Sequence, residues 1–304
     1  MLSKRFFKHH SSEYPGFRHL REGGIISKMR HAFREDIIKC LIYMLMIAII
    51  LLYLYPIWVI LIIALGADVY QAMPPEIIPL RPHLKGFEYV FSNPSFLQWI
   101  QNSLLFTLAV TGASILISIP AGYALSRVRF PGRSILFWLT VLGMMLPLVM
   151  LYVPLYIQLT RMKLINTYIG LIVPVIPSAY NVFLMKQAFD SVPEELQDAA
   201  TIDGAGPFTI AFRIFLPIIR PIVVTAMLFN IVWNWNNFAW PLFAAPQREY
   251  WTLPLGVFLS TWSYTIDFWK LAAGGTILFL PPLILYIIAT SYFLRGIEFA
   301  GLKR

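Results

Sequence analysis

The sequence contains little charge. Charged residues make up 13% of its 304 residues, whereas soluble domains carry about 25%. Hydrophobic residues make up 58%, and the mean hydropathy is +0.68. Six windows contain no Asp, Glu, Lys or Arg: 40–67, 89–126, 134–160, 164–185, 221–247 and 271–294. Each exceeds the roughly 20 residues that span a bilayer, so we predict an all-α membrane protein with six transmembrane helices.

Several groups that carry chemistry are absent. Cys40 is the only cysteine, which excludes an intrachain disulfide and a cysteine-based metal cluster. No Gly-Lys pair occurs, so the chain has no Walker loop for ATP phosphates. No histidine lies in the six windows. We therefore predict no catalytic or metal-binding residues. Ion-coupled secondary transporters and membrane-embedded enzymes such as transferases usually place ionisable groups at membrane depth, which disfavours these two alternatives without removing them.

The Lys and Arg residues predict the orientation of the chain. With a cytoplasmic N-terminus, the inner side carries nine before the first window, three in each of two loops and three at the C-terminus, which makes 18. The outer side carries six. Because Lys and Arg concentrate in cytoplasmic loops, we predict a multi-pass protein with both termini in the cytoplasm. The net charge of +9 then reflects topology and requires no nucleic acid.

The N-terminal residues 1–36 form a basic segment before the transmembrane domain, 37–304. Ile25, Met29, Phe33 and Ile37 recur every four residues, which predicts an interfacial helix, the alternative being a disordered basic tail. The following apolar run is too long for a signal peptide, so it should remain as the first span. A further charge-free window, 250–266, has 17 residues that include Pro and Gly and is predicted to be interfacial or re-entrant.

The polar loop 190–217 interrupts the apolar sequence. Ser191 and Glu194 have capping-box spacing, and Gly204 is a typical helix stop, so a short helix is predicted between them. Val192, Leu196 and Ala199 would form an apolar line along it. Its carboxylates are Asp190, Glu194, Glu195, Asp198 and Asp203. Helices that lie on anionic membranes usually carry Lys and Arg instead, so this acidic helix predicts a protein partner.

The same loop resembles the EAA loop of ABC importer membrane subunits. Asp198-Ala199-Ala200 is followed after three residues by Gly204, and after nine more by Ile214-Phe215-Leu216-Pro217. Asp198 replaces the usual Glu and keeps its charge. Segments 121–132, 235–242 and 296–303 are also similar to the maltose-transporter type of sugar permease, and the resemblance covers residues 40–304.

The resemblance implies a MetI-like permease fold with a cytoplasmic coupling helix, in the cell membrane of a bacterium or archaeon. It implies import of a mono- or oligosaccharide by a complex with a second homologous permease and two copies of an ABC ATPase. A solute-binding protein would deliver the sugar and meet the outer loop 68–98. ATP and Mg would bind to the ATPase, and no cofactor to this chain. The residues implied to contact the ATPase are Glu195, Leu196, Asp198, Ala199, Ala200, Asp203 and Gly204.

The fifth window is rich in Trp and Asn. Trp233, Asn237 and Trp240 would share one face of a continuous helix. Indole rings and carboxamides suit sugar rings and hydroxyls, so these three residues are candidates for the substrate pathway. The alternative is structural, because Trp also forms the interfacial belt and Asn often bonds a neighbouring helix.

The orientation can be tested by thiol labelling. In a Cys40→Ser background, Ser3→Cys and Lys303→Cys should not react with an impermeant thiol reagent in intact cells, because both lie on the side rich in Lys and Arg. His83→Cys should react. Labelling of position 303 from outside would contradict the six-span arrangement.

Overall fold

The computed structural model describes residues 16–66, 76–261 and 267–301. The chain divides into two compact units, Met1–Val59 and Ile60–Arg304. Helix α1 (Gly16–Ala64) makes up the described part of the first unit and ends in the second. The predicted boundary after residue 36 lies within this unbroken helix. Terminal positions 3 and 303 and the beginning of the outer loop, 67–75, lie outside the described residues.

The second unit consists of helices, and no strand occurs in the described parts of the chain. In chain order its elements are α2 (Lys85–Phe91), α3 (Phe96–Arg127), α4 (Arg133–Met145), α5 (Leu148–Arg161), α6 (Tyr168–Ile172), η1 (Val173–Val175), α7 (Ala179–Asp190), α8 (Glu194–Ile202), α9 (Pro207–Thr209), the π-helical η2 (Ile210–Phe215), α10 (Leu216–Trp235), α11 (Ala239–Ala244), η3 (Arg248–Tyr250), α12 (Leu253–Thr261) and α13 (Phe268–Gly301).

The candidate membrane spans overlap all six charge-free windows, but the span Pro207–Trp235 begins inside the predicted loop 190–217 and includes Arg213 and Arg220, whereas its window is 221–247. Four uninterrupted stretches are long and apolar enough to cross a bilayer: Asp36–Ala64, Phe96–Arg127, Pro207–Trp235 and Phe268–Ala289. Two bent pairs, α4 with α5 at 96° and α6–η1 with α7 at 45°, raise the number to six if each pair is one span. Pro147 and Pro177 lie at these breaks, where proline removes a backbone donor and interrupts the helix.

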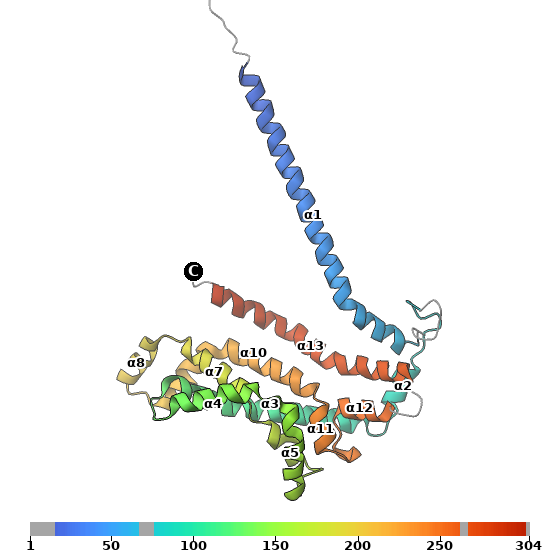
Figure 1. Cartoon of the computed structure of the whole chain (residues 1–304), viewed down its shortest axis with the longest axis vertical. Helices are drawn as coiled ribbons and strands as arrows, with labels where there is room; N and C mark the ends of the chain where they lie inside the picture. The colour runs from blue at the N-terminus through green and yellow to red at the C-terminus, as the bar shows by residue number, and fades with distance from the viewer. Residues whose placement is uncertain (1–15, 67–75, 262–266, 302–304) are drawn as a thin grey trace, which may run out of the picture. The chain divides into compact units, whose positions relative to one another are not determined.

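Helices α3, α4, α7 and α10 run side by side, with α8 at one end of the group and α11 and α12 near the other (Figure 1). Helices α3 and α7 approach each other closely at Gly122. A Cβ on Gly122 would lie 2.5 Å from Met185 Cβ and 2.8 Å from the Lys186 backbone nitrogen, so only glycine fits there. This contact allows the two helices to pack along their length.

Buried side chains form a core next to α8. Tyr123, Met185, Phe189 and Phe215 come from α3, α7 and η2, and the rings of Tyr123 and Phe189 meet edge to face at 5.4 Å. A second cluster surrounds Trp240 and a third surrounds Trp99, both toward α11 and α12. The nine-residue α12 is too short to cross a bilayer, which agrees with the prediction for the window that begins at residue 250.

Candidate functional site

The N-cap of helix α8 lies two residues later than the sequence predicted. The N-cap is Pro193, and Ser191 instead ends α7, where its hydroxyl donates a hydrogen bond of 2.7 Å to the Ala188 carbonyl. The predicted capping box with Glu194 is therefore wrong. The physical reason is that α7 continues to Asp190 and uses the Ser191 hydroxyl to satisfy one of its own last carbonyls.

The end of α8 agrees with the sequence prediction. Gly204 has φ +80°, a conformation that favours glycine. The N–H of Gly204 donates to the Thr201 carbonyl at 3.0 Å, and the N–H of Ala205 donates to the Ala200 carbonyl at 2.9 Å. These two bonds define a Schellman motif, which closes the helix and turns the chain toward α9.

The exposed surface of α8 is both acidic and apolar. Glu195, Asp198, Ala199 and Asp203 are exposed, and Leu196 keeps 42% of its surface. The predicted apolar line does not form a buried face, because only Val192, which precedes the helix, packs inward with Ala200. Sequence reasoning also missed two highly exposed apolar residues, Ile202 at 86% and Phe208 at 77%.

The last residue of α3 holds the beginning of the loop. The Arg127 side chain is 6% exposed, and its guanidinium donates to the Phe189 carbonyl at 2.6 Å and to the Val192 carbonyl. It also lies 5.3 Å from the centre of the Phe215 ring and 4.0 Å from a Glu194 carboxylate oxygen. A cation at the carbonyl end of a helix is favourable, so Arg127 joins α3, α7, η2 and the entrance of α8.

Neighbouring charges reinforce this cluster. Asp190 accepts a hydrogen bond from the Ser126 hydroxyl at 2.5 Å and pairs with Lys186 at 2.5 Å. Arg133, at the beginning of α4, donates to the Leu125 carbonyl at 2.7 Å and thereby satisfies the end of α3. The ends of α3 and α7 are thus bound to one another at the same level as α8.

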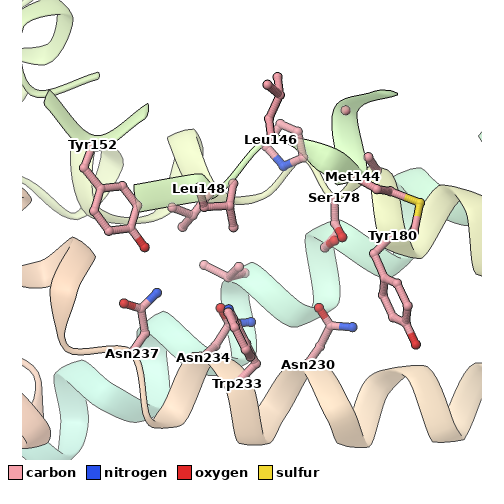
Figure 2. Close-up of a pocket in the computed structure, with 16 residues that line it drawn as sticks. Met144, Leu146, Leu148, Tyr152, Ser178, Tyr180, Asn230, Trp233, Asn234 and Asn237 are labelled. Atoms are coloured by element: carbon pink, nitrogen blue, oxygen red, sulfur yellow. The ribbon is translucent and has the colours of Figure 1, made fainter. Parts of the chain in front are cut away.

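A cavity of about 240 Å³ lies between α3, α7, α10 and the broken span α4–α5. Figure 2 shows Asn230, Trp233, Asn234 and Asn237 rising from α10 and its end toward Tyr152 and the residues of the α4–α5 break. The sixteen lining residues are Val110, Ser114, Gly143, Met144, Leu146, Leu148, Tyr152, Val175, Pro177, Ser178, Ala179, Tyr180, Asn230, Trp233, Asn234 and Asn237.

Asn230, which lines the cavity, forms an amide pair with the buried Asn181. Asn181 and Asn230 donate to each other's side-chain oxygen, at 3.0 and 2.9 Å. Asn181 also donates to the Ser114 hydroxyl at 2.8 Å, and Asn230 to the Ala226 carbonyl at 2.8 Å. Both N–H groups of each amide are therefore used, and the pair links α3, α7 and α10. Such bonds between helices are the structural role that Asn commonly has in membranes.

The three predicted pathway residues do not share one helical face, because α10 ends at Trp235. Trp233 is 69% exposed and lines the cavity together with Asn237. Trp240 lies on the separate helix α11, has no exposed surface, and donates its indole N–H to the Leu171 carbonyl at 2.8 Å. Its neighbour is Tyr152, with ring centres 5.5 Å apart. The structure thus brings Trp233 and Asn237 to the cavity and places Trp240 in the core behind it.

The comparisons with known proteins identify the family. Residues 114–299 match the model of the binding-protein-dependent transport system inner membrane component. The chain is 30% identical over 279 residues to the arabinooligosaccharides transport system permease protein AraQ of Bacillus subtilis, covering 90% of this chain and 99% of that protein. The chain therefore belongs to the family of binding-protein-dependent transport system inner membrane components.

Other relatives extend this result. The sn-glycerol-3-phosphate transport system permease protein UgpE of Yersinia pestis is 29% identical over 259 residues, covering 82% of this chain and 92% of that protein. A bacterial ABC transporter involved in the import of alginate shares the fold, with a TM-score of 0.71, 23% identity and coverage of 86% and 98%. The chain is thus a membrane permease subunit of an ABC importer and not an enzyme.

Removing the Arg127 guanidinium should release the loop that carries α8. In Arg127→Met the Phe189 and Val192 carbonyls lose a charged donor, and each such hydrogen bond contributes roughly 1.5–3 kcal/mol. We expect a Glu-specific protease to cleave at Glu194 and Glu195 several-fold faster in the purified variant. Arg129→Met, which removes the same charge from an exposed position two residues away, is the control. Equal cleavage of both variants would show that Arg127 does not hold the loop.

Proposed function

We propose that this chain is one of two homologous, non-identical permeases in an importer of mono- or oligosaccharides. Two copies of a cytoplasmic ATPase would bind ATP and Mg, and an extracytoplasmic solute-binding protein would deliver the sugar. Support comes from the relatives named above, one of which transports arabinooligosaccharides by its name. The resemblance of segments 121–132, 235–242 and 296–303 to sugar permeases also supports sugar import.

The observation that best supports the proposal is the acidic and apolar exposed surface of α8. Its exposed side chains combine four carboxylates with Leu196 and Ala199, and no basic residue occurs between Asp190 and Phe212. Such a surface fits a protein cleft that supplies basic and apolar groups, since charged hydrogen bonds and apolar burial would both be gained on docking. We propose that this cleft is on the ATPase and that Glu195, Leu196, Asp198, Ala199, Ala200, Asp203 and Gly204 form or shape the contact.

The contacts of Arg127 suggest how movement of α8 would reach the membrane helices. When the ATPases close on ATP, each would draw its α8 inward. Because the entrance of α8 is bonded to α3 and stacked on η2 through Arg127, the displacement would be shared with α3, α7 and α10. These helices line the cavity, so ATP-driven closure would change its access from one side of the membrane to the other.

We also propose that both termini and α8 lie in the cytoplasm. Helix α8 lies at one end of the helix group (Figure 1). Arg127 ends α3, Arg133 begins α4, Lys186 lies near the end of α7 before α8, and Arg213 lies in η2 after α9. Arg161 is the last residue of α5, and Arg248 is the first residue of η3. This arrangement supports the orientation that the 18 to 6 distribution of Lys and Arg predicts.

Gly204 provides a test of α8 as the ATPase contact. No atom lies within 4 Å of the position of its missing Cβ, so Gly204→Leu would act through its backbone, at a cost of about 1–2 kcal/mol for a left-handed residue. We expect the variant to insert in the membrane but to lose retention of the ATPase in pull-down and to lose sugar uptake. Gly204→Asn should retain most of both, because Asn tolerates this conformation.

Gly206→Leu is the matched control for that experiment. Gly206 also has open space at its Cβ position, but its φ is −75°, which any residue adopts. The Gly206→Leu variant should bind the ATPase and support sugar uptake. Normal association and uptake by Gly204→Leu would mean that α8 is not the coupling element.

A second test concerns the sugar contact at the cavity. Tyr152→Phe removes a hydroxyl that makes no hydrogen bond within the described residues, and it keeps the ring that packs on Trp240 and Phe243. We expect uptake by the assembled complex to fall several-fold while basal ATP hydrolysis and assembly stay near normal. Asn237→Leu should lower uptake further, because it also removes the side-chain oxygen that accepts a hydrogen bond from the Trp240 backbone N–H. If Tyr152→Phe transports normally, the hydroxyl does not contact substrate.

A further inference from the structure

The cavity contains no charge. None of its sixteen lining residues, all within the described part of the chain, is Asp, Glu, Lys, Arg or His. The four windows that contribute them also lack Asp, Glu, Lys and Arg along their whole length. Any charged group that this chain could offer to a molecule at that depth must therefore come from beyond the ends of these spans.

Part of the polar lining is already committed to holding the helices together. Asn230, which lines the cavity, and its buried partner Asn181 donate all of their amide N–H groups within the protein, and the lining residue Asn234 donates to the Thr111 hydroxyl at 3.3 Å. These groups stiffen the wall. They have few hydrogen-bond donors left with which to surround an anion, since a carboxylate or phosphate needs several.

The remaining groups at the cavity are neutral and amphipathic. The Tyr152 hydroxyl, the Asn237 amide N–H groups and the Trp233 indole N–H form no hydrogen bonds among the described residues, and Figure 2 shows the first two side chains facing the same space. Hydroxyl and amide groups bond sugar hydroxyls in both directions, and an indole ring covers the C–H face of a sugar ring. An ion brought here would lose water without gaining a counter-charge, which is costly.

From these observations, and on the basis of the proposed sugar-import function, we infer that the cavity selects uncharged saccharides over anionic ones. Family membership does not decide this property, because relatives are named for arabinooligosaccharides, for sn-glycerol-3-phosphate and, among solved structures, for the acidic polysaccharide alginate. We base the inferred preference for uncharged saccharides on the residues that line this particular cavity.

The test uses the complete importer, reconstituted in proteoliposomes with its second permease, ATPase and binding protein. Two sets of oligosaccharides of equal length and linkage are offered, which differ only in whether C6 is a hydroxymethyl group or a carboxylate. ATP-dependent uptake of the neutral set should exceed that of the uronic acid set by at least about tenfold, in keeping with the cost of an unpaired charge. Equal uptake, or uptake of the uronic acid set alone, would overturn the inference and leave the proposed sugar import intact. Uptake of neither set would overturn both.

A paired variant tests whether the cavity itself sets the preference. Leu148 lines the cavity and is 52% exposed. Leu148→Arg adds a counter-charge there, whereas Leu148→Gln adds polarity alone. The ratio of uronic acid uptake to neutral uptake should rise several-fold in Leu148→Arg relative to Leu148→Gln, measured on complexes matched for assembly and basal ATP hydrolysis. An unchanged ratio in assembled Leu148→Arg would overturn the cavity as the selecting element. If Leu148→Arg does not assemble, the comparison of the two sugar sets on the unmodified complex decides.

Discussion

One guanidinium group, that of Arg127, holds together the end of the helix group next to α8. Arg127 ends α3, yet its hydrogen bonds go to the carbonyls that end α7 and precede α8, and its face lies over Phe215. An almost fully buried cation needs such partners, because an unpaired charge in this position would be strongly destabilising. The same bonds leave α8 with a rigid entrance and an outward surface, so the loop is firmly attached to the bundle while its acidic and apolar groups remain available.

Much of the fold follows from the sequence. Absence of charge over more than 20 residues is a strong physical constraint, because a charged side chain is costly in hydrocarbon. The six windows overlap the four uninterrupted candidate spans and the two bent helix pairs. The bends within the two broken helix pairs are harder to predict from the sequence. Pro147 and Pro177 indicate that a helix can break, but the 96° angle between α4 and α5 depends on packing against helices distant in the sequence. Local patterns contain no such information.

In the candidate site, too, local features can be predicted from the sequence, whereas features that depend on packing between distant segments cannot. Gly204 was predicted as a helix stop and has positive φ, since a Schellman turn depends on local backbone geometry. Ser191 was assigned to the wrong helix because either neighbour could use its hydroxyl, and the competition was decided by the length of α7. Trp240 was placed beside Trp233 by helical spacing, which fails once α10 ends at Trp235. Tyr152 reaches the cavity from a different candidate span, and no pattern within one segment indicates its position there.

The continuity of η2 with α10 has a mechanical consequence. Phe215, beneath Arg127, and Trp233, at the cavity, are 18 positions apart on adjoining helical segments, a separation of about 27 Å at 1.5 Å per residue. Treated as a rod pivoting at Phe215, a tilt of about 10° would carry the backbone at Trp233 sideways by about 5 Å over that length. This distance is comparable to the width of a side chain. A small rotation near Phe215 would therefore become a displacement at Trp233 that is large enough to change the shape of the cavity.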